Sequence, residues 1–248
     1  MNITLAEQLQ VESAAHSDRF DLYTAIHKAL RHWMSHVLVD LGQIDTRDES
    51  ACARTLGDLD GVLDALTAHL NVENQFIHTA IDARDAGTSA RIAGEHQAHE
   101  AAMARLRQLG KAVADAEATG RDRLALALYR AFALFMAENL EHMQFEETEH
   151  HRALWASYSD AELLGIHQSI LAAIPREKMA AVLHWMIPAI TPANRAAMLA
   201  DMRAAMPPAA FGAILELARS RLGLADWTKL SMALGVPQVP GLVNLSRH

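Results

Sequence analysis

The stretches HLNVE, at residues 69–73, and HMQFE, at residues 142–146, each place a histidine four residues before a glutamate. Both stretches lie in long segments with helical periodicity. Residues four apart on a helix share one face, with Cβ atoms about 5–6 Å apart. Each stretch can therefore present an imidazole and a carboxylate to the same point. Two such pairs on two helices of a bundle can hold one metal ion, or two, between them.

The distribution of proline predicts the fold around these two stretches. All seven prolines follow residue 174, and β-branched residues are sparse before residue 170. Long uninterrupted helices are the natural interpretation. Their expected spans are about 18–41, 48–84, 89–119 and 121–157. Because the connections are short, neighbouring helices should run antiparallel, and the expected fold is all-α, an up-down four-helix bundle with an additional C-terminal helical segment.

The expected organisation has four parts: an N-terminal arm (1–17), the bundle (18–158), a C-terminal helical region (159–236) and a tail (237–248). Proline punctuates the third part into short helices, expected at 160–173, 175–187, 192–205, 208–222 and 226–234. Asp160, Thr191 and Asp226 are the predicted N-caps, with Pro192 at a first helical position. Short helices with one apolar face cannot bury it alone. We therefore expect this region to pack on the bundle or to form an interface with a second copy or a protein partner.

Composition excludes several classes of partner. The formal net charge is −8 at pH 7, and nucleic acids and anionic membranes both require clustered cationic residues. Cys52 is the only cysteine, so no internal disulfide can form, which fits a reducing cytoplasm. Residues 1–19 have neither a basic start nor an apolar run, so no signal peptide is expected. The sequence therefore predicts a cytoplasmic protein that binds neither nucleic acid nor membrane.

The helical turn of about 100° per residue predicts which polar side chains face the core. The side chains predicted to face inward are those of His27, His69, Glu73, His96, His99, His142 and Glu146. His32, His36 and His78 are predicted to point outward, and the acidic run after His142 is expected to be mostly solvated, with Glu149 a minor ligand candidate. A single inward histidine is commonly a hydrogen-bonded core residue. Inward histidines on all four helices favour a metal site, because a metal also compensates the cost of burying two carboxylates.

The same residues resemble a known family. IHKALR around His27, HLNVENQFIH from His69, EHQAHEAAMARL around His96 and HMQFEETEHH from His142 are similar to segments of hemerythrin-like, or HHE, domain proteins. The resemblance covers about residues 18–155. It implies a four-helix bundle that holds a non-haem di-iron centre. The ligands it implies are His27, His69, Glu73, His96, His142 and Glu146, with the two glutamates bridging two iron ions.

Two departures from the family pattern bear on function. Oxygen-carrying hemerythrins have two histidines four apart on the third helix and an aspartate after the last histidine. This chain has His96 and His99 three apart, and Glu146 after His142. The Glu-His order favours His96 as the ligand, with His99 a fifth imidazole or a supporting residue. Both departures weigh against reversible oxygen carriage.

The function expected from this resemblance is binding or sensing of dioxygen, nitric oxide or peroxide, or handling of iron. Whether the centre also turns over a substrate stays open. Three alternatives remain: a metal-dependent sensor or adaptor whose C-terminal helices engage a partner, a mononuclear or zinc site, and a metal-free helical interaction protein.

Overall fold

The computed structural model describes residues 19–238, except for the side chains at positions 118 and 176. The predicted N-terminal arm and nearly all of the predicted tail lie outside these residues. All regular secondary structure in the described part is helical, as the sequence predicts. The elements are α2 (Thr24–Gly42), α3 (Glu49–Val72), η1 (Glu73–Ile77), α4 (His78–Arg84), α5 (Ala90–Asp115), α6 (Ala118–Phe145), η2 (Glu146–His150), α7 (His151–Ser157), α8 (Asp160–Ala173), α9 (Arg176–Ala189), α10 (Pro192–Ala205), α11 (Pro208–Arg221) and α12 (Leu224–Leu234).

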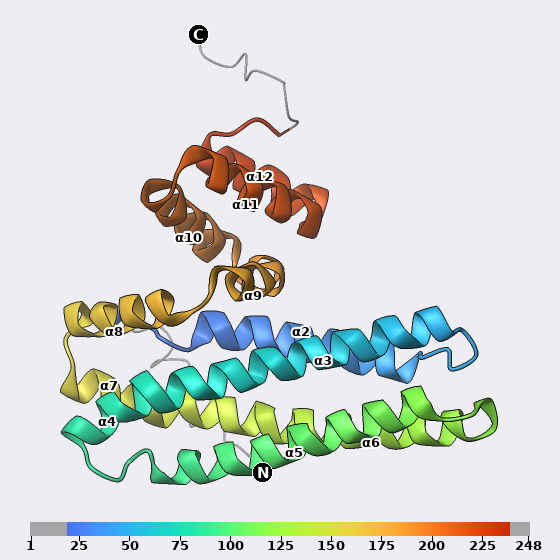
Figure 1. Cartoon of the computed structure of the whole chain (residues 1–248). Helices are drawn as coiled ribbons and strands as arrows, with labels where there is room; N and C mark the ends of the chain where they lie inside the picture. The colour runs from blue at the N-terminus through green and yellow to red at the C-terminus, as the bar shows by residue number, and fades with distance from the viewer. Residues whose placement is uncertain (1–18, 239–248) are drawn as a thin grey trace, which may run out of the picture. The chain divides into compact units, whose positions relative to one another are not determined.

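Four long helical stretches surround a shared core in the first part of the chain. Helix α2 packs against α3 and α6, and α5 packs against the same two helices. The direction of the chain reverses from each stretch to the next (Figure 1). Helices α3 and α4 continue into one another through the π-helical turn η1, and α6 and α7 do so through η2. The predicted helices over 48–84 and 121–157 are therefore continuous, and each contains one π turn.

Apolar residues with helical spacing bury the inner face of these stretches. On α2, Leu30, Met34 and Val37 are at most 3% exposed, as their periodicity predicts. A side chain of this kind stabilises the fold by about 1.5–3 kcal/mol when fully buried. Helices α2 and α3 approach closely at Gly61, where an added Cβ would lie 3.0 Å from the ring of Trp33. Apolar packing along the four stretches thus holds the polar residues between them in place.

Helix α8 belongs to the same compact unit as these stretches, which extends to Pro175. Its Leu163 packs with Ile77, Ile81 and Leu154. The hydroxyl of Tyr158, just before the helix, donates to the carbonyl of Ala80 at 2.7 Å. The N-cap of α8 is Ser159, whose side chain forms a capping box with Glu162. The predicted cap at Asp160 is therefore wrong by one residue, because the serine hydroxyl makes the capping hydrogen bond.

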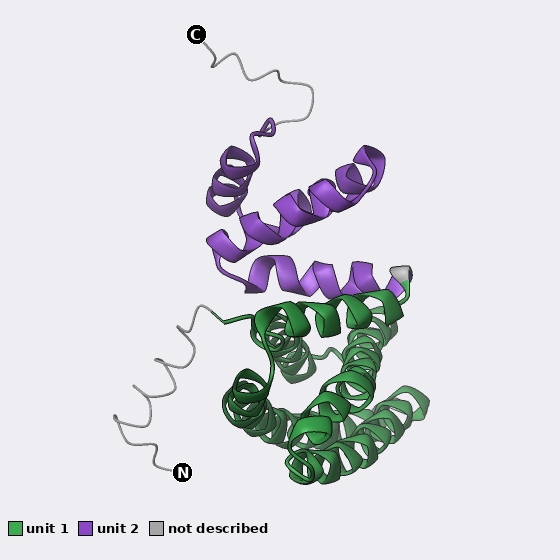
Figure 2. Ribbon diagram, turned by 90° about the vertical axis from the view of Figure 1, so that its left-hand side faces the viewer, with its two compact units in different colours: residues 1–175 green, residues 176–248 purple. Residues whose placement is uncertain are grey.

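Helices α9 to α12 belong to a second compact unit, which begins at Arg176 (Figure 2). They share a core of their own, which consists of Leu183, Ile187, Leu199, Phe211, Ala218, Trp227, Leu230 and Leu234. Thr191 caps α10 and Pro192 opens it, as predicted. The N-cap of α12 is Gly223, so the predicted cap at Asp226 is wrong and that residue lies in the first turn. Packing of α9 to α12 on the bundle or at an interface stays a prediction.

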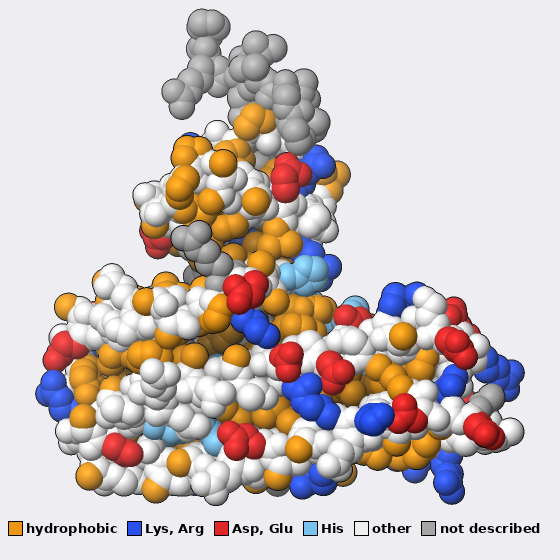
Figure 3. All heavy atoms as spheres, viewed as in Figure 1, with side chains coloured by type: hydrophobic (Ala, Val, Ile, Leu, Met, Phe, Trp, Pro, Cys, Tyr) orange, Lys and Arg blue, Asp and Glu red, His pale blue; other side chains and the backbone are white. Residues whose placement is uncertain are grey.

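The surface of the first unit mixes charges of both signs. Red and blue side chains alternate on the face seen in Figure 3. Arg107 of α5 illustrates this, because it pairs with Asp60 at 3.1 Å and with Asp64 at 2.8 Å, both on α3. Within residues 19–238, none of the helices has the length and apolar character that crossing a membrane requires.

Candidate metal centre

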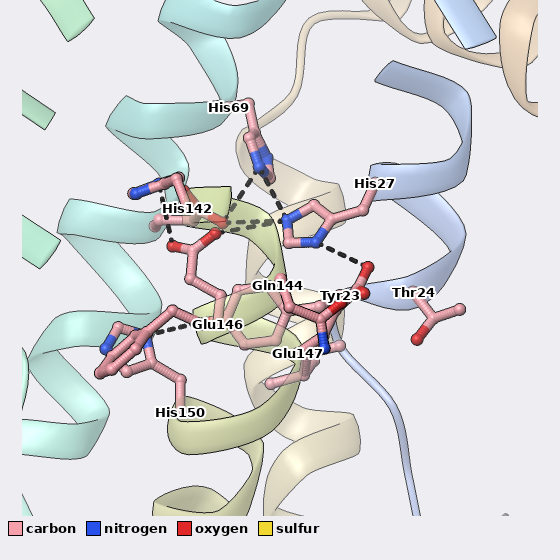
Figure 4. Close-up of polar contacts among 12 residues, drawn as sticks. Tyr23, Thr24, His27, His69, His142, Gln144, Glu146, Glu147 and His150 are labelled. Atoms are coloured by element: carbon pink, nitrogen blue, oxygen red, sulfur yellow. Dashed lines mark hydrogen bonds and ion pairs between the residues drawn. The ribbon is translucent and has the colours of Figure 1, made fainter. Parts of the chain in front are cut away.

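Six side chains predicted to face inward meet at one place between the long helical stretches. His27 comes from α2, His96 from α5, and the two His-x-x-x-Glu pairs from the junctions α3–η1 and α6–η2. Figure 4 shows His27 reaching from α2 toward His69 and Glu146. Five of the six residues are at most 3% exposed, and His69 is partly exposed. The structure therefore gathers all six residues in a centre that is almost closed to solvent.

The four imidazoles of this centre form two pairs. The Nε2 atoms of His27 and His69 lie 3.2 Å apart, and so do the Nε2 atoms of His96 and His142. The first pair comes from α2 and α3, and the second comes from α5 and α6. We call the space next to the first pair position 1 and the space next to the second pair position 2.

The two carboxylates span both positions. Oε1 of Glu73 lies 3.0 Å from Nε2 of His69, and its Oε2 lies 3.5 Å from Nε2 of His96. Glu146 has the complementary arrangement, with Oε2 3.5 Å from Nε2 of His27 and Oε1 3.4 Å from Nε2 of His142. Each glutamate thus presents one oxygen to each position. Position 1 and position 2 each have two nitrogen and two oxygen donors.

The spacing of these donors fits metal ions. Donors about 2.1 Å from one cation, separated by angles of about 90–110°, lie roughly 3.0–3.4 Å apart. The shorter N···O separations within the two sets run from 3.0 to 3.7 Å, and the donor atoms of each position all lie within 4.8 Å of one another. Contractions of under an ångström would complete both sets. The four carboxylate oxygens of Glu73 and Glu146 are buried and accept no hydrogen bond within the described chain, which is costly unless a cation compensates them.

A carboxylate–arginine pair orients the His27 ring. Nδ1 of His27 lies 3.0 Å from Oε1 of Glu147 and donates to it, since a carboxylate only accepts. Both terminal nitrogens of Arg31 donate hydrogen bonds to the same carboxylate, at 2.6 and 3.1 Å. A donor on Nδ1 directs the Nε2 lone pair of His27 into position 1. Glu147 is half-buried, so the expectation of a mostly solvated acidic run is wrong at this residue.

The two imidazoles of position 2 are held in the same way. Nδ1 of His142 donates to Oε2 of Glu95 at 3.0 Å, and Nδ1 of His96 donates to Oδ1 of Asn74 at 2.8 Å. When both rings are neutral, both Nε2 atoms carry lone pairs and no proton lies between them. Two lone pairs 3.2 Å apart repel each other. A cation between them converts this repulsion into ligation.

The surroundings favour the neutral, metal-binding form of both imidazoles at position 2, but they favour the protonated form of His27 at position 1. Desolvation lowers the pKa of His96 to about 3 and that of His142 to about 4. Burial also acts to lower the pKa of His27, but the hydrogen bond with Glu147 and the nearby carboxylate of Glu73 outweigh it and raise that pKa. In the metal-free protein, protons therefore compete for His27 more strongly than for the imidazoles of position 2.

The two carboxylates differ in the metal-free protein although both are buried. Burial and the negative charge of Glu73 raise the pKa of Glu146 well above its usual range. Burial acts in the same direction on Glu73, but the neighbouring His69 and His27 hold its pKa well below its usual range. Two buried carboxylates at this spacing cannot both ionise freely without added positive charge. Ionisation of both carboxyls therefore requires additional positive charge at the centre.

The π turns add two histidines that the sequence did not assign. In η1 the backbone N–H of His78 donates to the carbonyl of Glu73, five residues earlier. This hydrogen bond places His78 one turn above Glu73, and the residue is 5% exposed. The prediction that His78 points outward is wrong, because regular α-helical geometry at 100° per residue misses the extra residue in the turn. His150 lies at the end of η2 and is fully buried.

The remaining candidate residues lie outside the two positions. His99 is buried, and its ring centroid lies 4.7 Å from that of His142, but it contributes no atom to either donor set. Glu149 forms an ion pair with Arg152 instead. His36 is exposed on α2 and pairs with Asp40 at 3.2 Å. The supporting roles of Asn74, Glu95 and Glu147 carried no signal in the sequence, because their partners lie on other helices.

Comparison of the chain with protein-family models, with curated proteins and with solved structures finds no match. Conclusions about function therefore depend on the geometry of the centre.

Proposed function

We propose that residues 24–157 form a hemerythrin-type four-helix bundle that holds two iron ions bridged by Glu73 and Glu146. One observation carries this proposal. The Nε2 atoms of His96 and His142 lie 3.2 Å apart, and each ring is held by a hydrogen bond from its Nδ1, so both Nε2 atoms present a lone pair to the same space. Two bridging carboxylates and four imidazoles support two cations rather than one. The family resemblance of the same residues points in the same direction.

The donor set favours iron among the available metals. Imidazole suits iron, zinc and copper, while carboxylate oxygens favour harder ions and can bridge two of them. Two nitrogens and two oxygens complete a tetrahedral zinc site, whereas a six-coordinate iron ion keeps open positions. Bound iron supplies those open positions and one-electron chemistry to a small ligand such as dioxygen, nitric oxide or peroxide. Buried apolar residues, including Leu66, Phe135 and Met143, limit access of bulk water.

Metal analysis tests the proposal directly. Protein produced with iron should contain about two iron atoms per chain and absorb in the near ultraviolet when oxidised, as expected for ferric ions with nitrogen and oxygen ligands. His27→Ala should lower the iron content, whereas Glu149→Gln, a change in the same acidic run outside the donor sets, should leave it unchanged. No metal after reconstitution would refute the proposal. One metal, or zinc alone, would replace it with a mononuclear or structural site.

A second candidate function is sensing, in which the metal or ligand state of the centre alters the binding of a partner by helices α9 to α12. The observation that favours it is the separate core of α9 to α12. Removal of residues 176–248 should then abolish partner binding while leaving the iron content at its full value. Loss of iron in the truncated chain would instead link these helices to the stability of the centre.

A further inference from the structure

His78 and His150 form a second histidine pair beside position 2. Their ring centroids lie 5.3 Å apart with an edge-to-face orientation. The ring of His78 also stacks on that of His96 at 4.9 Å. The Nε2 atoms of His78 and His150 are buried and have no hydrogen-bond partner in the described part of the chain. These two buried nitrogens have no role in the centre described above.

Together with Glu146, this pair makes a third donor group. One ligand atom from each of His78, His150 and Glu146 lies within 4.8 Å of the other two. Donors to one cation lie at most about 4.2 Å apart, so movements of under an ångström would close the group. The hydroxyl of Tyr23 lies 3.1 Å from Nδ1 of His150. When Nδ1 donates to that hydroxyl, the Nε2 lone pair of His150 faces the group.

The charges around the group favour a cation in transit over a third permanent one. Glu146 belongs to all three donor groups, and within the described residues Glu73 is the only other carboxylate among their donors. Three divalent cations would leave a large net positive charge in a medium that screens it poorly. A cation at the third group is therefore favoured while the paired positions are still incomplete.

An exposed carboxylate lies one turn of α4 after His78 of the third group. Asp82, in α4, is exposed and acts electrostatically on both His78 and His150. Ser89 fixes that carboxylate with a hydrogen bond of 2.6 Å. A cation attracted to Asp82 would lie one helical turn from His78, whose ring contacts that of His150.

We propose that His78, His150 and Glu146 form a loading position that receives a divalent cation from solvent and passes it to the two paired positions. Glu146 makes the transfer, because the same carboxylate belongs to the loading position and to both paired positions. This proposal rests on the two-metal function proposed above.

Stopped-flow mixing of the full-length metal-free protein with Co²⁺ tests the proposal, since the visible absorption of Co²⁺ reports its ligands. Wild-type protein should show two phases: a rapid phase whose rate rises with Co²⁺ concentration, then a slower phase whose rate does not. The variant His78→Leu/His150→Leu should lose the rapid phase and load about tenfold more slowly or worse, by analogy with the loss of supporting groups at other metal sites. Its final content should still be two metals. His99→Ala, a buried histidine next to the centre but outside the three groups, should load like wild type.

The outcomes separate this proposal from the function on which it rests. A single phase in wild type, or loading by the double variant within twofold of the wild-type rate, would overturn the loading position while leaving the two-metal centre intact. Failure of wild type to bind Co²⁺ or Fe²⁺ would overturn the two-metal centre itself. If the double variant does not fold, as judged by circular dichroism, the number of phases in wild type still decides.

Discussion

Replacing Glu146 with glutamine should shift stability in opposite directions with and without metal. In the metal-free protein, Glu146 is fully buried next to Glu73 without a hydrogen bond to its oxygens. Its raised pKa keeps Glu146 protonated in the folded metal-free protein, so folding above pH 4.5 takes up a proton at a cost of about 1.4 kcal/mol per pH unit. Glutamine needs no proton, and Glu146→Gln should therefore stabilise the metal-free protein by about 2 kcal/mol at about pH 6. For a unit of this size, that corresponds to a rise in Tm of about 4–8 °C.

The metal-loaded protein should respond in the opposite way. Loading at a free metal concentration about a thousandfold above Kd adds roughly 4 kcal/mol per position. Glutamine cannot bridge two cations, so the variant should lose most of this increment. Thermal unfolding followed by circular dichroism, with chelator and with Fe²⁺ under anaerobic conditions, measures both effects. Glu149→Gln is the matched control and should change neither melting temperature by more than about 1–2 °C, the scale of an exposed substitution.

The pH dependence of stability in the metal-free protein tests the sign of the effect of Glu146→Gln. The raised pKa of Glu146 means that the folded metal-free protein binds a proton that the unfolded chain releases above pH 4.5. Stability contributed by this group is therefore present at low pH and declines as the pH rises above that value. The difference between Glu146→Gln and wild type should grow as pH rises. A variant that is less stable without metal, or that keeps the full metal-dependent increment, would refute the placement of Glu146.

Three further predictions concern the histidines and their supports. Glu147→Gln should weaken metal binding at position 1 by about 10- to 100-fold, measured by competition with a chelator, because it loosens the hydrogen bond that orients His27. On acidification, position 1 should lose its metal first, because the pKa of His27 is raised whereas that of His96 is about 3. Absorbance during an acid titration measures the order of metal release, and release of both metals in one step would contradict the prediction. His96→Ala should lose the metal of position 2 whereas His99→Ala should keep both metals, so the opposite pattern in metal analysis would show that the wrong helix-α5 ligand was chosen.

Much of the helical layout could be predicted from the sequence because its signals are local. Proline and glycine mark where the helices end, and apolar spacing marks the buried face, as at Leu30 and Met34. The same geometry brought His27 and His96 to the inner face, because each lies in regular α-helix. The interiors of the helices could be predicted better than their caps. In α8, for example, the N-cap is Ser159 and not the predicted Asp160.

What the sequence could not predict depends on contacts across the fold. A π turn shifts hydrogen bonds from four to five residues and leaves no mark in the apolar pattern, so His78 was placed on the wrong face. The supporting role of Glu147 requires Arg31 and His27, which are more than a hundred residues away in the chain. Asn74 is exposed and follows Glu73 directly, and its role becomes visible only through its contact with His96 on α5.

The centre is divided between two αα-hairpins with matching parts. Each hairpin brings one histidine from its first helix, then a histidine, a glutamate and a π turn from its second. The residue after each glutamate reaches across the divide, Glu147 to His27 and Asn74 to His96. Neither hairpin alone completes a position, so a metal bound there would cross-link the two hairpins. A single hairpin of this design, paired with a second copy of itself, would assemble the same set of donors by symmetry.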